Sequence, residues 1–409
     1  MQTKTHSKFD VGGVMLDQPF KIRRLGHFGL NVDDPQACVN FYTELLGFRI
    51  SDTIDLGARM PDGGKSFGDP KAYFMRHGTD HHSFVLFNRG VMSHFAANSK
   101  NALPADVTVN QMTWQVGSLK EIAGGVDWFR ANDVDIHRIG RDMPGSNWHV
   151  YPYDTEMHRN ELYYGMEQIG WQGFSKPQEA HERGFEAQPT LPQMPEYQEV
   201  NALIARGADL NSGVRHPETQ PASYDVDGIL LPRPFKVVRH GPVRLFCHDP
   251  EKAERFYTEV MGLVRTETIT WRGHRAVFLR CNTEHHVLAL YPIAIRDELG
   301  WPKTTTLAGF GMQVGSYRQL RDAIAYLRDR GARFVTFPSE LTPGIDYAAY
   351  LLDPAGHPIQ LYYSMEQIGW DGRVRPHEGK SMPPIADWPE TVAARSDSYM
   401  GETYLGPWG

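Results

Sequence analysis

Hydrophobic and polar residues alternate with a period of two along several short stretches of the chain, which is typical of half-buried β-strands. Residues 25–32 (LGHFGLNV) show this pattern, and Asp34 and Pro35 then open a helix that ends before Gly47. Two further strand-like stretches follow, KAYFMRH and HHSFVLF. The first ninety residues therefore predict a strand, a helix and then more strands.

The same pattern begins again near residue 110. NQMTWQVG is a strand-like stretch, and Ser118 with Glu121 forms a capping box at the start of an amphipathic helix. WHVYPYD and RNELYYG supply the later strands. We therefore expect two βαβββ units here, in an α+β architecture whose curved mixed sheets enclose a pocket.

The whole arrangement is repeated in the second half of the chain. DVGGVMLDQPFKIRRLG, from Asp10, returns as DVDGILLPRPFKVVRHG from Asp225, and YYGMEQIGW returns as YYSMEQIGW. The offset shrinks from 215 to 199 along the repeat, as loop deletions in the second copy would cause. We expect module 1 at 1–178, a Pro-rich connector with a short helix opening at Pro195 at 179–223, module 2 at 224–375, and an aromatic-containing tail at 376–409.

Composition narrows the range of functions. Forty-two Lys and Arg against 49 Asp and Glu leave a net charge of −7, which argues against a nucleic-acid-binding protein. No stretch approaches the roughly 18 apolar residues of a membrane span, and the N-terminus lacks the apolar core of a signal peptide. The three cysteines are widely spaced, so we expect a cytoplasmic protein without disulfides, whose oligomeric state, a homo-oligomer included, is open.

Three features together resemble the vicinal oxygen chelate superfamily: four βαβββ units, the helix motif D-P-x-x-x-x-x-F-Y-T-E-x-x-G, and the H-H pair on the strand after it. Two such modules in one chain are most similar to type I extradiol ring-cleaving dioxygenases. The resemblance covers both modules, but not the connector or the tail. It implies a divalent metal held by residues on the first and last strands of paired units, with open positions for substrate and O2.

Each module can be tested for such ligands. Module 1 offers His27, Gln111 and Glu161 at the implied positions. The aligned residues of module 2 are Pro242, Gly309 and Gln360, none of which is an imidazole or a carboxylate. We therefore expect a metal in module 1 and none in module 2, although the dioxygenases that the chain resembles usually carry it in their C-terminal module and use a second His where Gln111 stands.

Three other residues of module 1 match pocket positions of that family. His82 corresponds to a histidine that handles the protons of the bound substrate, and the period of two puts it on one strand face with Phe84, with His81 on the other face. Tyr151, three residues before Asp154, corresponds to a tyrosine that donates to a substrate oxygen, and His149 shares its face. His82 and Tyr151 have counterparts in module 2, His286 and Tyr350, so packing roles shared by both copies stay open.

The resemblance implies an extradiol-type dioxygenase that acts on a catecholic or related phenolic compound with O2. The metal expected is Fe(II), with Mn(II) or another divalent metal as alternatives. His27, Gln111 and Glu161 would bind it, His82 would shuttle protons, and Tyr151 or His149 would stabilise an oxyanion. Two alternatives are a metal-dependent epimerase, isomerase or lyase acting through an enediolate, with His82 as a fourth ligand, and a binding protein without catalysis.

Overall fold

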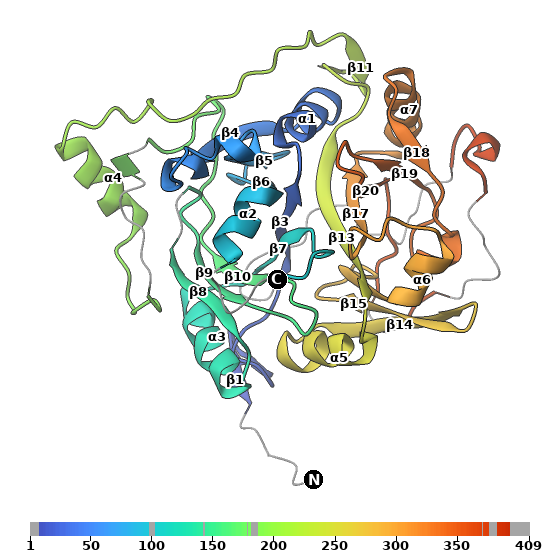
Figure 1. The fold of residues 1–409 in the computed structure, drawn as a ribbon, viewed down its shortest axis with the longest axis horizontal. Helices are drawn as coiled ribbons and strands as arrows, with labels where there is room; N and C mark the ends of the chain where they lie inside the picture. The colour runs from blue at the N-terminus through green and yellow to red at the C-terminus, as the bar shows by residue number, and fades with distance from the viewer. Residues whose placement is uncertain are drawn as a thin grey trace.

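Two eight-stranded sheets, each curled into a half-barrel, lie side by side and form the body of the molecule (Figure 1). Their coordinates come from a computed structural model of the 409-residue chain. The structure describes residues 8–97, 103–141, 144–177, 179–180, 187–369, 371–375 and 383–392.

Module 1 forms the sheet on the left of Figure 1, with strand order β4-β5-β6-β3-β7-β10-β9-β8. In that order the strands are β4 (Arg49–Asp55), β5 (Lys71–Arg76), β6 (Phe84–Asn88), β3 (Arg24–Val32), β7 (Val109–Gln115), β10 (Asn160–Tyr164), β9 (Trp148–Pro152) and β8 (Ile136–Arg141). The helices are α1 (Pro35–Asn40), which continues as a π-helical turn (Phe41–Leu45), α2 (Arg89–Ala96) and α3 (Leu119–Ala131). The two predicted βαβββ units are confirmed.

Module 2 has the same strand order, which confirms that the repeat folds alike. Its strands are β14 (Val264–Trp271), β15 (His274–Arg280), β16 (Leu288–Pro292), β13 (Val237–Cys247), β17 (Leu307–Val314), β20 (Pro358–Tyr362), β19 (Ala348–Leu352) and β18 (Arg333–Val335). Its helices are α5 (Pro250–Arg255), followed by a π-helical turn (Phe256–Val260), α6 (Ile293–Glu298) and α7 (Tyr317–Asp329).

Local signals in the sequence account for where the helices begin and end. The Asp34 side chain accepts a hydrogen bond from the backbone N–H of Ala37 and caps α1, and Gly47 takes a left-handed conformation (φ +82°) after the turn that follows. Ser118 caps α3 by accepting from the backbone N–H of Glu121. Both helix starts were predicted at these residues.

The two modules share one hydrophobic core. Phe28 of β3 stacks on Phe310 of β17, with ring centroids 4.4 Å apart, and Phe84 stacks on the same ring at 5.6 Å. Two reciprocal hydrogen bonds add to this contact: Tyr42 of module 1 donates to Asp353 of module 2, and Tyr257 of module 2 donates to Asp154 of module 1. Both tyrosines lie in the F-Y-T-E motif, so the motif serves the interface between the modules.

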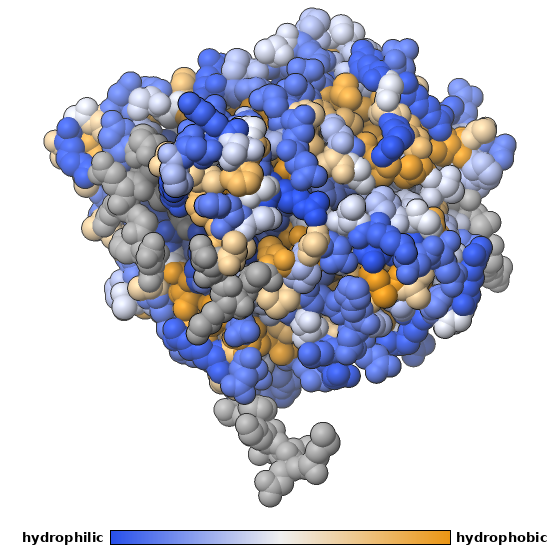
Figure 2. Space-filling view, in the orientation of Figure 1, coloured by the Kyte–Doolittle hydropathy of each residue, from blue (hydrophilic) through white to orange (hydrophobic). Residues whose placement is uncertain are grey.

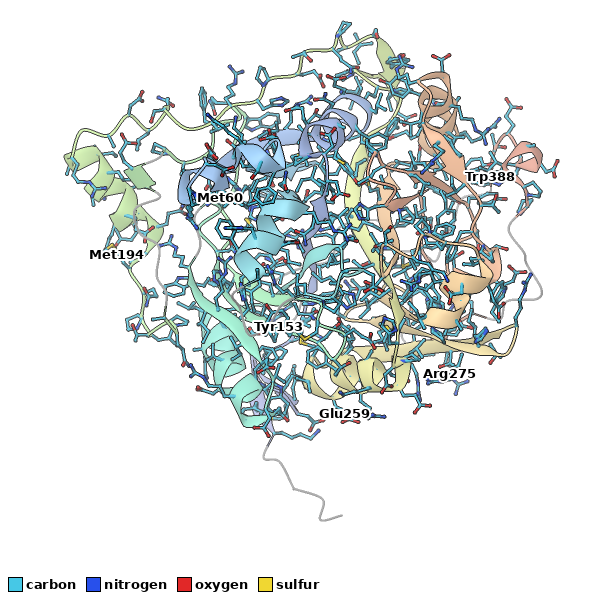
Figure 3. The ribbon with its side chains drawn as sticks, in the orientation of Figure 1. Met60, Tyr153, Met194, Glu259, Arg275 and Trp388 are labelled. Carbon is cyan, nitrogen blue, oxygen red and sulfur yellow. The ribbon has the colours of Figure 1, made fainter. Side chains whose placement is uncertain are left out.

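The connector and the tail pack on the outside of the modules. Helix α4 (Glu196–Ala205) begins after Pro195, as predicted, and Glu199 pairs with Arg141 of β8 at 2.6 Å. Trp388, labelled in Figure 3, lies against Tyr317 and Tyr347 of module 2. Most of the predicted tail, 376–382 and 393–409, lies outside the described residues.

Two short hairpins complete the described fold, β1 (Phe9–Val11) with β2 (Val14–Leu16) and β11 (Tyr224–Val226) with β12 (Ile229–Leu231). Hydrophilic residues cover most of the face seen in Figure 2, and hydrophobic residues form small separate areas on it. Within the part of the chain that the structure describes, no helix has the length and apolar character needed to cross a lipid bilayer.

Candidate metal centre

A row of polar side chains crosses the middle of the module 1 sheet. His27 on β3 lies opposite Thr113 on β7, and Thr113 lies opposite Glu161 on β10. Leu162, the next residue, packs towards Gly125 of α3, so Glu161 points to the other, concave face of the sheet. We call this concave face and the side chains on it the cup of module 1.

Hydrogen-bond donors surround the carboxylate of Glu161, which is fully buried. Nε2 of His27 lies 3.0 Å from Oε2. The Thr113 hydroxyl donates to Oε2 at 3.0 Å, and the Gln111 amide donates to it at 3.3 Å. The Asn147 amide donates to Oε1 at 2.8 Å. The structure therefore brings the three sequence-predicted ligands together, with His27 and Gln111 both in contact with the Glu161 carboxylate.

The surroundings of Glu161 keep it ionised. Burial on its own raises the pKa of this carboxyl, but the electrostatic effect of His27 and its hydrogen bond lower the pKa. His149 and a hydrogen bond from Tyr151 lower it further, so that the pKa lies below the ordinary 4.5. A buried carboxylate held in its charged form is the kind of group that binds a cation.

Tyr151 and His149, both on β9, also lie near the Glu161 carboxylate. Tyr151 hydrogen-bonds Glu161, and the His149 ring lies against the Tyr151 ring at 4.8 Å. The Tyr151 ring has a second contact: the guanidinium carbon of Arg138 lies 4.6 Å from the ring centre. Tyr151 therefore presents its hydroxyl to the carboxylate while a cation lies over its ring, and this O–H is a donor that a developing anion could accept.

His82 also faces the cup, but not as part of the regular strand. Its ring lies 4.3 Å from that of His27 and 5.1 Å from that of Phe74. Burial, His27 and His81 together hold the pKa of His82 well below its ordinary 6.5, so the imidazole is neutral. A neutral imidazole in contact with the His27 ring can accept a proton from a bound molecule.

The prediction that His82 shares a strand face with Phe84, with His81 on the opposite face, is wrong. The strand β6 begins only at Phe84, and the chain bends at 81 and 83. Nδ1 of His81 lies 3.0 Å from Nδ1 of His82. Phe84 points into the shared core, whereas Val85 belongs to the hydrophobic cluster beside the cup. The bends therefore break the period of two on which the prediction rested.

Two residues of this site were not found from the sequence. Thr113 lies two positions after Gln111 on the same strand, so the period of two already indicated that both face the cup. Asn147 precedes β9 in a loop, where no periodic pattern exists. Loop residues of this kind can be placed only by the fold.

Module 2 has a different arrangement at the equivalent positions. Arg244, the counterpart of Gly29, is fully buried, and its guanidinium hydrogen-bonds the Gln360 amide oxygen. Gln360 in turn donates to the Tyr350 hydroxyl at 2.6 Å. A Cβ added at Gly309, the counterpart of Gln111, would lie 3.1 Å from Nη1 of Arg244. In module 2, the Arg244 guanidinium thus provides the positive charge at the position where we expect a metal ion in module 1.

The residues in the cup of module 1 fit a divalent metal. Two donors at right angles, each about 2.1 Å from one metal, lie about 3.0 Å apart, which is the separation of His27 Nε2 and Glu161 Oε2. The structure shows no group of three or more His, Cys, Asp or Glu side chains able to hold a metal among the residues that it describes. The candidate donor set is the His27 imidazole, the Glu161 carboxylate and the side-chain amide of Gln111, whose NH2 group faces the carboxylate.

Comparison with known proteins shows the family. The model of the Glyoxalase/Bleomycin resistance protein/Dioxygenase superfamily matches residues 24–162 and 239–361. The chain belongs to this superfamily. Over 129 residues it is 26% identical to 2,2',3-trihydroxybiphenyl dioxygenase from Sphingomonas paucimobilis, a match that covers 32% of this chain and 42% of that protein. The match thus spans less than half the length of this curated relative.

Solved structures share the fold at low sequence identity. The Mn(II)-bound glyoxalase from Novosphingobium aromaticivorans superposes with a TM-score of 0.54 at 14% identity, over 86% of this chain and 85% of that one. A halotolerant catechol dioxygenase gives 0.54 at 15% identity, over 88% and 93%. Homoprotocatechuate 2,3-dioxygenase from Brevibacterium fuscum, in complex with 3,4-dihydroxyphenylacetate, gives 0.52 at 15% identity, over 86% and 83%.

Proposed function

We propose that the chain is an extradiol-type dioxygenase that cleaves a catecholic or related phenolic ring with O2 at a metal in module 1. The observation that carries this proposal is the buried pair of His27 and Glu161, with Gln111 beside it, in a member of a superfamily that includes dioxygenases. The 2,2',3-trihydroxybiphenyl dioxygenase relative supports the choice of reaction.

His27, Gln111 and Glu161 would hold the metal, with Fe(II) as the first choice and Mn(II) as the alternative. A divalent metal held there would supply Lewis-acid chemistry towards an aromatic diol and O2. Thr113 and Asn147 orient the Glu161 carboxylate through their hydrogen bonds. The protein's own ligands are thus held in place before substrate arrives.

The remaining residues act on the substrate. His82, neutral and buried, accepts a proton from a substrate hydroxyl. Tyr151, with Arg138 over its ring, and His149 stabilise the negative charge that remains on the substrate oxygen. His27, Glu161 and His149 are all buried, so these groups are shielded from bulk solvent.

A second candidate function follows from Gln111. An amide oxygen is a weaker ligand for Fe(II) than an imidazole and suits harder ions such as Mn(II) or Mg(II). The same residues could then serve a metal-dependent isomerase or lyase, in which His82 moves a proton on a carbon next to a carbonyl. This alternative predicts bound metal without O2 consumption.

The test begins with anaerobic purification, measurement of bound metal, and reconstitution with Fe(II) or Mn(II). We expect one metal per chain, and O2 uptake with members of a panel of catechols that includes 3,4-dihydroxyphenylacetate. Glu161→Gln removes the charge but keeps the shape, and should weaken metal binding by more than about 100-fold, the upper range for supporting residues.

Gln360→Ala is the matched control, because Gln360 is the module 2 counterpart of Glu161. It should leave the metal content unchanged. Wild-type protein that binds no divalent metal after reconstitution would contradict both functions, and metal binding without O2 uptake on any diol would favour the second.

A further inference from the structure

Arg244 of β13 places a positive charge inside module 2. Its side chain is fully buried on the concave face of the module 2 sheet, which we call the cup of module 2. The neighbouring Val243 and Leu245 pack into the core shared by the modules, whereas Phe246 belongs to a separate hydrophobic cluster. Because side chains alternate along a strand, Arg244 lies on the same face as Phe246. The guanidinium is therefore surrounded largely by apolar side chains.

Most of this guanidinium lacks a hydrogen-bond partner. Nη2 donates to the amide oxygen of Gln360, but Nε and Nη1 are buried and have no partner among the residues that the structure describes. In the same part of the chain, no carboxylate oxygen lies within 4.0 Å of the guanidinium nitrogens. Three other buried arginines, Arg23, Arg233 and Arg296, each have a carboxylate within that distance. Arg244 is thus a buried cation without a contacting anionic side chain.

The polar groups nearest to Arg244 are uncharged. Gln360 is the counterpart of Glu161, so a neutral amide stands where module 1 has a carboxylate. Burial raises the pKa of Tyr350, and burial, followed by neighbouring positive charge, holds the pKa of His286 well below 6.5, so both side chains are neutral. An unpaired charge removed from water is very unfavourable. The cup of module 2 therefore favours an anion over a neutral molecule or a cation.

Room for a small ion exists beside Nη1 of Arg244, where Gly309 has no side chain. A Cβ placed on Gly309 would lie 3.1 Å from Nη1, a distance at which an N–H donates a hydrogen bond. Apart from the adjoining backbone, the only other described atom within 4 Å of that point is the carbonyl oxygen of Pro358, at 4.0 Å. Aromatic and aliphatic side chains pack the rest of the cup. The space therefore suits an ion of one or a few atoms and not a large organic acid.

We propose that the cup of module 2 is a binding site for a small monovalent anion, of the kind that chloride represents, held by Nη1 of Arg244 beside Gly309. One negative charge neutralises one guanidinium, whereas a divalent anion would leave a net charge buried in the cup. The anion stabilises the folded module because it removes the cost of burying Arg244 unpaired. This site is separate from the candidate metal centre, and binding to it can be measured without any enzymatic activity.

The dependence of stability on chloride tests this site in the full-length protein. Unfolding in urea is measured at about 1 and about 100 mM chloride, with gluconate added to keep the ionic strength constant. We expect the folding equilibrium constant of the wild type to rise about 10-fold, because an ion that binds only the folded state stabilises it in proportion to its concentration above the dissociation constant. Arg265→Gln removes an exposed arginine of the same module and should keep the full response.

Two variants remove the need for an external anion in opposite ways. Arg244→Gln removes the cation, and Gln360→Glu gives the guanidinium a carboxylate within the protein. Both should reduce the response to chloride to less than about twofold. Gln360→Glu keeps Arg244 and pairs its charge, so it provides the test even if Arg244→Gln fails to fold. A wild type that does not respond to chloride, or a response that persists in Gln360→Glu, would overturn the proposal.

A second measurement locates the ion directly. Bromide replaces chloride at small-anion sites, and its anomalous scattering marks its position in crystals of the wild-type protein soaked in bromide. We expect a peak beside Nη1 of Arg244 in the wild type and none at that place in Gln360→Glu. Bromide found only at the protein surface, as an adventitious ion only, would show that the cup of module 2 is not an anion site.

Discussion

At the scale of single residues, the site consists of the buried carboxylate of Glu161 and the side chains that donate hydrogen bonds to it. An ionised carboxylate removed from water is very costly unless hydrogen bonds or a cation replace its hydration. Glu161 receives donors from Thr113 and Asn147 as well as from the candidate ligands His27 and Gln111. The supporting donors act on the carboxylate oxygens and so fix the direction in which Glu161 points.

Thr113→Val tests this support. Valine has nearly the same shape but lacks the hydroxyl, so one oxygen of Glu161 loses its 3.0 Å hydrogen bond. We expect the affinity for the divalent metal to fall about 10- to 100-fold, as is usual when a group that orients a ligand is lost. Isothermal titration calorimetry of the metal-free protein with Mn(II) measures this change in affinity. An unchanged dissociation constant would show that Thr113 does not orient Glu161.

At the scale of elements, the two cups differ by an exchange across the pair of strands at the sheet centre. In module 1, β3 carries Gly29 and β7 carries Gln111; a Cβ at Gly29 would lie 3.0 Å from Cγ of Gln111. In module 2, β13 carries Arg244 and β17 carries Gly309 at the paired positions. A small residue on one strand makes room for the long side chain on the other.

Gly29→Arg should convert the cup of module 1 to the arrangement of module 2. The guanidinium would reach the Glu161 carboxylate as Arg244 reaches Gln360, and would occupy the place of a divalent ion. We expect metal content to fall to background, with far-ultraviolet circular dichroism retained. Metal analysis by mass spectrometry after reconstitution measures the outcome. Val238→Arg, a change at an exposed site on β13, is the control for adding a cation. Full metal binding in Gly29→Arg would refute the placement of the site.

At the scale of the whole molecule, the modules are joined by buried polar contacts as well as by the shared core. His158 of module 1 is one of these: its Nδ1 lies 3.1 Å from Asp154, and its Nε2 lies 2.9 Å from the Thr306 hydroxyl of module 2. Asp154 also accepts a hydrogen bond from the Tyr257 hydroxyl of module 2. Protonation of one imidazole therefore affects the contact between two modules.

The stability of the molecule should depend on pH through His158. Burial opposes its charge, but the Asp154 carboxylate outweighs burial and raises the pKa above the ordinary 6.5. Protonated His158 therefore stabilises the folded state. This stabilisation is complete below about pH 6.5, the pKa of a histidine in an unfolded chain, and is lost as the pH rises through the raised pKa of His158. We expect the free energy of unfolding in urea to fall over this range.

His158→Leu should remove this part of the pH dependence. It should also lower the free energy of unfolding at pH 6 by about 1 to 3 kcal/mol, because buried Asp154 loses a donor. Urea titrations of both proteins at several pH values between 6 and 8.5 measure the two effects. A wild-type profile no steeper than that of His158→Leu would contradict the assignment.

Patterns along the chain are sufficient to predict most of the fold. The period of two, the caps at Asp34 and Ser118 and the repeat are local properties or comparisons between copies, so they indicate the βαβββ units and the second module without any knowledge of distances. The same comparison separates His27 and Glu161 from Pro242 and Gln360. That His27 and Glu161 are neighbours could be expected because paired strands bring distant residues into one row.

Other features depend on how the strands and loops meet in space. Asn147 reaches Glu161 from a loop, His81 contacts His82 because the chain bends before β6, and Arg244 enters its cup because Gly309 leaves room on the neighbouring strand. No periodic pattern or fixed spacing in the sequence predicts these contacts, because each depends on the packing of segments far apart in sequence or on a break in regular structure. The residue types of the site can therefore be read from the chain, whereas their hydrogen-bond partners follow from the folded arrangement.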